Sequence, residues 1–181
     1  MPRLEIDGPN YNATPPQAND LLEVVGFLLV FETEESKLNE LLRWEERELP
    51  EKRELTSRWR NYGYYLHSLL WLGLVAGEGR FREGGFAVTP KGRLFIEANE
   101  RERLTILRRI LLQDEIFQEI KKCKIDGVPL SLMRAMLTRK IMHIDCKWKN
   151  AWGRPLVEST AKRRLSCAIS WSRTLGIFPQ R

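Results

Sequence analysis

Apolar positions recur at helical spacing in two long segments, one in the middle of the chain and one at its end. The first is TSRWRNYGYYLHSLLWLGLV, Thr56 to Val75, and its apolar stripe, which begins one residue earlier, consists of Leu55, Trp59, Tyr62, Leu66 and Leu69. The second is STAKRRLSCAISWSRTLGIF, Ser159 to Phe178, and its stripe consists of Ala161, Leu165, Ala168, Ile169 and Ser172. This spacing places each stripe on one face of an α-helix, so both segments are predicted to be helices that pack through that face.

The two segments are predicted to be copies of one structural unit. Superposing LGLV, which begins at Leu72, on LGIF, which begins at Leu175, gives an offset of 103 residues and sets Arg60 opposite Arg163. Two shorter predicted helices precede each segment, at 19–30 and 36–44 in the first half and at 114–123 and 130–139 in the second. Identity between the halves is low, so the duplication is inferred from the order and pattern of the elements.

Glycine-rich sequence follows the first long helix and predicts a β-hairpin. In LVAGEGRFREGGFAVTP, the apolar runs Leu74–Ala76 and Phe86–Thr89 flank glycines that permit a tight turn, with Arg80 and Arg82 near its tip. Thr89 and the proline after it have the residue types of an N-cap and a first helical position. The helix that begins there, with its continuation, joins the two halves.

Three helices followed by a hairpin is the element order of a winged helix, whose third helix enters the major groove of DNA. We therefore expect a mainly α fold with a short β-hairpin, built as a tandem winged helix-turn-helix. Residues 1–18 are an N-terminal arm, 19–98 the first unit and 99–181 the second. The second unit ends at LGIFPQR without a hairpin. Either its wing is dispensed with or the chain is a fragment of a longer polypeptide, and we favour the fragment.

Composition and charge favour a folded protein with a polyanionic partner. The chain has 43% hydrophobic and 30% charged residues, which suits a buried core. Its formal charge of +6 is unevenly distributed: residues 1–120 hold 16 Lys and Arg against 21 Asp and Glu, a balance of −5, and residues 121–181 hold 14 against 3, a balance of +11. A basic C-terminal part indicates nucleic-acid binding. The alternative is a basic surface that serves solubility alone.

Targeting signals are not apparent in the sequence. No apolar run approaches the length of a membrane span, and MPRLEIDGPNYNATPP lacks the apolar core of a signal peptide. Three cysteines, an odd number, suit a reducing compartment better than a disulfide framework. We therefore expect a cytoplasmic protein that does not bind membranes.

The polar faces of the two long helices supply the candidate DNA contacts. Arginine pairs with guanine edges, asparagine with adenine, and serine with phosphate. On the first helix and the hairpin the candidates are Arg53, Ser57, Arg60, Asn61, Tyr64, Arg80 and Arg82. On the second helix they are Ser159, Thr160, Lys162, Arg163 and Arg164. The alternative is an ordinary solvated helix face, which would more often carry Glu–Lys pairs, and no acidic residue follows Glu158.

The loop KIMHIDCKWKNAWGRP, residues 140–155, interleaves basic and aromatic residues. Lys147, Lys149 and Arg154 would neutralise the DNA backbone, and Trp148 is a further candidate DNA contact, because exposed aromatics such as Trp148 and Trp152 beside basic residues can stack on a base or sugar. The alternative is that the tryptophans close the core, which we expect for at least one of them.

Two residue sets imitate catalytic or metal sites without the usual geometry. Asp114, Glu119 and Lys121 resemble an Asp…Glu-x-Lys nuclease string, but they fall on one predicted helix rather than at the ends of strands. The potential zinc ligands, which contain no Cys-x-x-Cys pair, are Cys123, His143, Cys146 and Cys167. We therefore expect no catalytic residue, no metal and no cofactor.

The sequence LGLV after a long helix, a glycine-rich turn and TPKGRLFIEAN together resemble the winged-helix modules of prokaryotic DNA-processing proteins. Among these are the recognition regions of restriction endonucleases, where tandem winged helices precede a separate nuclease domain. The resemblance covers most of residues 18–178. It implies sequence-specific binding of double-stranded DNA by a recognition or effector module of the restriction-modification type, with a nuclease domain elsewhere, C-terminal in the full-length chain. The alternatives are a free-standing winged-helix transcriptional regulator and a winged-helix protein–protein adaptor, which the acidic residues 31–54 favour for the first half.

Overall fold

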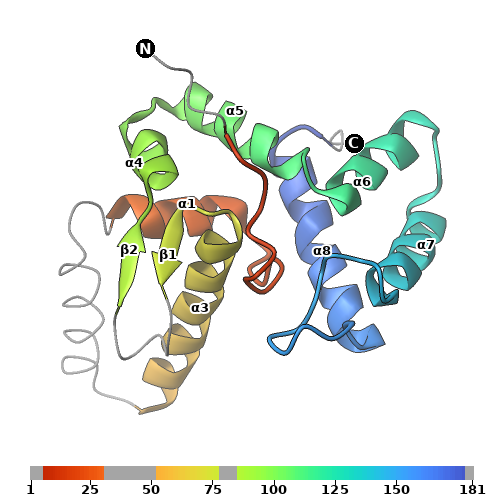
Figure 1. The fold of residues 1–181 in the computed structure, drawn as a ribbon, viewed down its shortest axis with the longest axis horizontal. Helices are drawn as coiled ribbons and strands as arrows, with labels where there is room; N and C mark the ends of the chain where they lie inside the picture. The colour runs from red at the N-terminus through yellow and green to blue at the C-terminus, as the bar shows by residue number, and fades with distance from the viewer. Residues whose placement is uncertain (1–5, 31–51, 78–84, 178–181) are drawn as a thin grey trace.

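The computed structural model describes residues 6–30, 52–77 and 85–177, and side chains of the third helix from Tyr62 onward. It is mainly helical with one small antiparallel hairpin (Figure 1), which confirms the predicted fold class at that level. The helices described are α1 (Leu21–Val30), α3 (Lys52–Trp71), α4 (Pro90–Glu97), α5 (Glu100–Leu111), α6 (Glu115–Ile125), α7 (Leu130–Met142) and α8 (Glu158–Thr174). The hairpin strands are β1 (Val75–Gly77) and β2 (Phe86–Val88).

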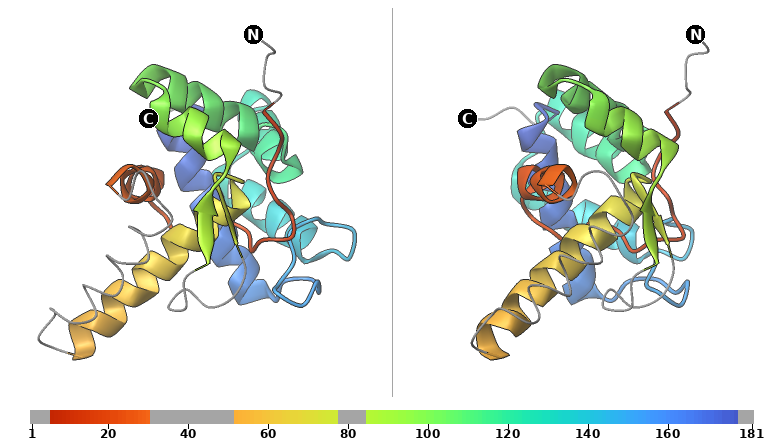
Figure 2. Two further views of the ribbon diagram at one scale, coloured as in Figure 1. Left: turned by 60° about the vertical axis from the view of Figure 1, so that its left-hand side comes forward. Right: turned by 90° about the vertical axis from the view of Figure 1, so that its left-hand side faces the viewer.

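Most predicted elements are confirmed where the structure describes them. Val75 pairs with Val88, and Gly77 with Phe86, so the hairpin has the predicted position. The predicted helix at 36–44 and the hairpin tip with Arg80 and Arg82 lie outside the described residues. Figure 2 shows the N-terminal part of α3 projecting away from the other described helices.

The segment TPKG fastens α4 to the hairpin. The Thr89 side chain accepts a hydrogen bond from the Gly92 backbone N–H, which makes it the predicted N-cap, and its hydroxyl donates to the Gly73 carbonyl at 2.7 Å. A Cβ on Gly92 would lie 2.0 Å from the Leu74 carbonyl oxygen, so only glycine permits this close approach. The linking helix is split in two, because Asn99 starts α5 with a capping box.

The two halves share one hydrophobic core. Trp71, at the end of α3, lies 5.9 Å from Trp148, 6.1 Å from Phe117 and 6.4 Å from Trp171, measured between ring centroids. All four rings are fully buried, and three of them belong to the second half. The units inferred from the repeat are therefore packed against each other.

The N-terminal segment from Ile6 to Asp20 contacts both halves. The Asn10 backbone N–H donates to the Trp71 carbonyl at 2.7 Å, and the Trp171 indole N–H donates to the Ala18 carbonyl at 2.9 Å. Gln113 of the second half donates to the Ile6 carbonyl. Among the described residues, none of the helices has the length and apolar character needed to cross a bilayer.

Candidate nucleic-acid interface

Helix α8 buries its predicted apolar stripe and exposes part of its basic face. Ala161, Leu165, Ala168, Ile169 and Ser172 are all buried, as predicted. On the other side Ser159, Lys162 and Arg163 are exposed, while Thr160 and Ser166 are half-buried. The spacing of three and four residues brings Ser159, Lys162, Arg163 and Ser166 onto one side of the helix, and we refer to these four as the α8 face.

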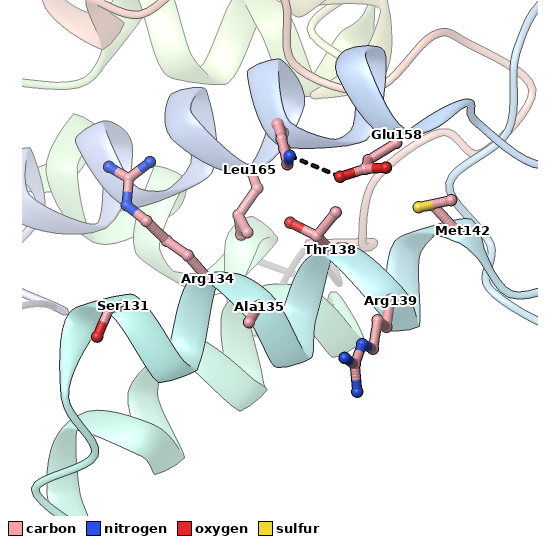
Figure 3. A pocket seen from close by; sticks show the side chains of 9 residues that line it. Ser131, Arg134, Ala135, Thr138, Arg139, Met142, Glu158 and Leu165 are labelled. Carbon is pink, nitrogen blue, oxygen red and sulfur yellow. Dashed lines mark ion pairs between the residues drawn. The ribbon is translucent and has the colours of Figure 1, made fainter.

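A groove between α7 and α8 adjoins this face (Figure 3). The helices run antiparallel, because Met142, at the end of α7, lies beside Glu158, at the start of α8. The groove has a volume of about 620 Å³ and is lined by Ser131, Arg134, Ala135, Thr138, Arg139, Met142, Glu158, Lys162 and Leu165. Leu165 gives the groove an apolar surface, and the basic side chains that line it are Arg134, Arg139 and Lys162.

Hydrogen bonds and an ion pair hold the edges of the groove. Arg134 Nη1 donates to Ser166 Oγ at 3.2 Å, which links α7 to the α8 face. Lys162 Nζ lies 2.6 Å from Glu158 Oε1, and this contact lowers the pKa of the glutamate. Within the described residues no ion pair involves Arg139 or Arg163. These two guanidinium groups are exposed and therefore available to an anionic partner.

Three lysines elsewhere in this half already have partners within the protein. Lys140 Nζ lies 3.5 Å from Glu115 and 3.3 Å from Glu119, between two carboxylates of α6. Lys147 Nζ lies 4.9 Å from the centroid of the Tyr11 ring, and Lys149 donates to the Ile144 carbonyl. Arg154 is exposed. The predicted loop contacts Lys147 and Lys149 are therefore partly engaged within the protein, which reduces what they can offer to DNA.

Trp148 requires a correction. It was predicted to contact DNA, but the ring is fully buried and its indole N–H donates to Asp114 Oδ2 at 2.9 Å. Trp148 is therefore a core residue. Trp152, four positions later, is 83% exposed. The sequence had left open which tryptophan closes the core.

Arg164 also requires a correction. It was placed on the exposed flank of α8, but only 6% of the residue is exposed. Its electrostatic neighbours include Tyr64 and His67 of α3, so this side of α8 faces the first half. Burial lowers the pKa of Arg164 to about 10, and burial together with the Arg164 charge lowers the pKa of His67. The Nε and Nη1 donors have no hydrogen-bond partner among the described residues.

We expect Arg164→Met to leave DNA binding unchanged and to raise the free energy of unfolding by about 1–2 kcal/mol. A buried donor without a partner costs about 1–3 kcal/mol, and a well-packed apolar side chain removes that cost. Urea denaturation measures the change, with Arg163→Met as the exposed control, for which we expect a change within about 0.5 kcal/mol. A loss of stability in Arg164→Met would mean that the guanidinium is satisfied in the folded protein.

The remaining predicted site residues are located only in part. The side chains of Arg53, Ser57, Arg60 and Asn61 lie outside the described residues, and Tyr64 is half-buried. The sequence interpretation missed Arg134 and Arg139, because it took candidate contacts only from the two long helices, the hairpin and the 140–155 loop. A signal was present: Ser131, Arg134, Thr138 and Met142 recur at helical spacing and form one side of the groove.

The residues whose spacing resembles a nuclease or zinc site have other contacts in the structure. Asp114 is buried and caps α6, and Glu119 pairs with Lys140. Cys123, Cys146 and Cys167 are buried free thiols, and burial raises the pKa of the last two to about 11. Within the part of the chain that the structure describes, no cluster of three or more His, Cys, Asp or Glu could hold a metal ion.

Comparisons with protein-family models, with curated proteins and with solved structures found no match to this chain. The functional interpretation therefore depends on the geometry and charge of the residues themselves. Among these, the α8 face and the adjoining groove combine exposed cations with small hydroxyl groups.

Proposed function

We propose that the C-terminal half binds double-stranded DNA, with the N-terminal part of α8 approaching the major groove. The observation that carries the proposal is the α8 face, where Lys162 and Arg163 are exposed beside Ser159 and Ser166. The major groove is wide enough for one α-helix, and arginine can pair with a guanine edge there. Small hydroxyl residues allow a close approach, and Arg134 and Arg139 of α7 flank the helix as phosphate contacts.

The distribution of charge supports the same partner. Residues 121–181 hold a balance of +11, whereas residues 1–120 hold −5. Lys140 is compensated by Glu115 and Glu119, but α8 has one acidic residue, Glu158, and it pairs with Lys162. Arg134, Arg139 and Arg163 are exposed near the α8 face with no ion pair among the described residues, and this positive charge favours a polyanion at the surface.

We further propose that the first half is a winged helix and that the chain is a recognition or effector module of the restriction-modification type. The order α1, α3 and hairpin supports the first part of this proposal. The second half differs, because residues 143–157 separate α7 from α8, whereas helix-turn-helix motifs use a turn of about 3–4 residues. A free-standing transcriptional regulator remains the alternative, and the mass of the protein in solution with DNA distinguishes a dimeric regulator from a monomeric module.

A salt titration tests the proposed function. Three cations placed at phosphates, Arg134, Arg139 and Lys162, should give a slope of log Kd against log salt concentration of about 2–3, since each neutralised phosphate contributes about 0.9. Fluorescence anisotropy with a pool of random duplexes measures it. We expect Arg134→Gln with Arg139→Gln to reduce the slope by about 1–2. The proposal fails if binding is absent at low salt or does not change with salt concentration.

Exposed apolar residues favour a second candidate function, docking of a protein partner. Ile125, Leu132 and Met136, at the end of α6 and along α7, are exposed. Leu132 and Met136 lie four positions apart on α7 and so share one side of that helix, and neighbouring exposed apolar side chains mark protein interfaces more often than isolated ones do. Leu132→Gln with Met136→Gln would weaken such docking without adding charge beside Arg134 and Arg139, and would leave DNA binding intact, so the two functions can be separated.

A further inference from the structure

Residues 149–155, within the loop that joins α7 to α8, form a small ordered turn. Lys149 pairs with Pro155 in an isolated antiparallel bridge, and the Asn150 backbone N–H donates to the Arg154 carbonyl at 2.9 Å. The Asn150 side-chain oxygen accepts hydrogen bonds from the backbone N–H groups of Trp152, at 2.9 Å, and Arg154, at 3.0 Å. Gly153 has a φ of +70°, a conformation that favours glycine. We refer to this segment as the 149–155 turn.

Both ends of the turn are anchored in the core. Cys146 and Trp148 precede it and Leu156 follows it, and all three are buried. Trp148 is held by its hydrogen bond to Asp114, the residue that caps α6. The turn is therefore fixed with respect to the helices of the second half. The segment that contains it leads directly into the N-terminal end of α8 (Figure 1).

The turn presents one large aromatic side chain to solvent. Trp152 is 83% exposed, whereas the Trp71, Trp148 and Trp171 rings are fully buried. The backbone bridge, the three hydrogen bonds of Asn150 and the Gly153 conformation thus order a turn whose central residue, Trp152, does not pack in the core. Because the backbone that carries the indole is already ordered, binding would cost less conformational entropy than ordering a free loop, which suits a contact residue.

The charge around Trp152 indicates the class of partner. The loop from 143 to 157 contains Lys147, Lys149 and Arg154 against a single acidic residue, Asp145. Arg154, two positions from the indole, is exposed. Aromatic side chains beside cations are the usual means of stacking on a nucleobase while neutralising the adjacent phosphate.

We propose that Trp152 stacks on a nucleobase of the bound DNA, at a step where the duplex is unstacked or kinked, while the α8 face occupies the adjacent groove. This inference rests on the proposed DNA binding. In an intact duplex both faces of each base are covered, so insertion requires local unstacking, as with the apolar wedges of proteins that bend DNA. A mismatched base pair lowers that cost and should strengthen binding.

The test compares binding of Trp152→Ala, Trp152→Phe and the wild-type protein to one duplex, with and without a central mismatch. Stacking predicts that Trp152→Ala weakens binding by about fivefold or more at every salt concentration, with an unchanged salt slope. The wild-type preference for the mismatched duplex should disappear in Trp152→Ala and persist in Trp152→Phe. Leu132→Ala, another exposed apolar residue, is the matched control and should bind as the wild type does.

Each other outcome counts against the inference in a distinct way. Salt-dependent binding that is equal in Trp152→Ala and wild type overturns the stacking role and leaves the proposed function standing. Absence of binding by the wild-type protein overturns both. A reduced salt slope in Trp152→Ala means that the indole only positions Arg154. If Trp152→Ala loses co-sedimentation with phosphatidylserine vesicles but binds DNA as the wild type does, the turn contacts a membrane surface instead.

Thermal unfolding of both variants checks that the fold is retained, and Trp152→Phe keeps the test decisive if Trp152→Ala unfolds.

Discussion

Asp114→Ala is expected to lower the free energy of unfolding by about 3–5 kcal/mol, the largest loss that we predict for one substitution. Asp114 is fully buried, and its carboxylate accepts four hydrogen bonds. One oxygen accepts from the backbone N–H groups of Ile116, at 2.9 Å, and Phe117, at 3.2 Å. The other accepts from the Tyr11 hydroxyl and the Trp148 indole N–H, both at 2.9 Å.

The charge state of this cluster follows from its surroundings. Burial raises the pKa of Asp114, and its four hydrogen bonds act in the opposite direction by stabilising the carboxylate. Burial and the nearby Asp114 charge raise the pKa of Tyr11, so the phenol keeps its proton and remains a donor. Alanine would leave four donors facing an apolar methyl group, two of them on side chains that fasten the N-terminal segment and the 143–157 loop.

Urea denaturation followed by circular dichroism measures the loss of stability, and two variants with smaller expected losses serve as comparisons. Tyr11→Phe removes one of the four hydrogen bonds and should cost about 1–2 kcal/mol. Asp126→Ala changes an exposed aspartate at the other end of α6 and should cost less than about 0.5 kcal/mol. If Asp114→Ala is no less stable than Asp126→Ala, the Asp114 hydrogen bonds do not stabilise the fold.

Sequence periodicity predicted the helices and the hairpin because their patterns are local. The stripe of α8, the glycines around β1 and β2 and the cap at Thr89 are each specified by residues within a few positions. The role of Asp114 could not be predicted in this way, because its partners Tyr11 and Trp148 lie 103 and 34 residues away. No pattern within one helix distinguishes such a carboxylate from a surface residue.

The misplacement of Arg164 has a different physical cause. A helical wheel with one apolar stripe assumes that a helix packs on one side, but α8 packs against α6, α7 and α1. A central helix is buried around more of its circumference, so residues on the flank of the stripe also become buried. Burial was equally hard to predict for Trp148 and Trp152. They lie in a loop without periodicity, and both have basic neighbours in the sequence. Only tertiary structure separates the anchored residue from the exposed one.

Correction of Arg164 leaves Arg163 as the principal candidate for base contact on α8. Arg163 is exposed on the α8 face, and the structure shows no ion pair to it among the described residues. Arg60, its counterpart in the first half, follows a segment, 31–54, with nine acidic and five basic residues. Because the local charge attracts phosphate only in the second half, binding free energy should be concentrated there.

We therefore expect Arg163→Ala to weaken specific DNA binding by about 1–3 kcal/mol, at least as much as Arg60→Ala, and to relax preference at one base position. Lys140→Ala is a matched control, since it removes a cation of the same half whose charge Glu115 and Glu119 already compensate, and it should leave affinity unchanged. Anisotropy titrations against a selected duplex, followed by single-base variants of that duplex, measure both effects. A loss that is equal for all sequences would make Arg163 a phosphate contact rather than a base reader. If Arg60→Ala abolishes binding and Arg163→Ala does not, the first half reads the DNA and α8 has been assigned the wrong role.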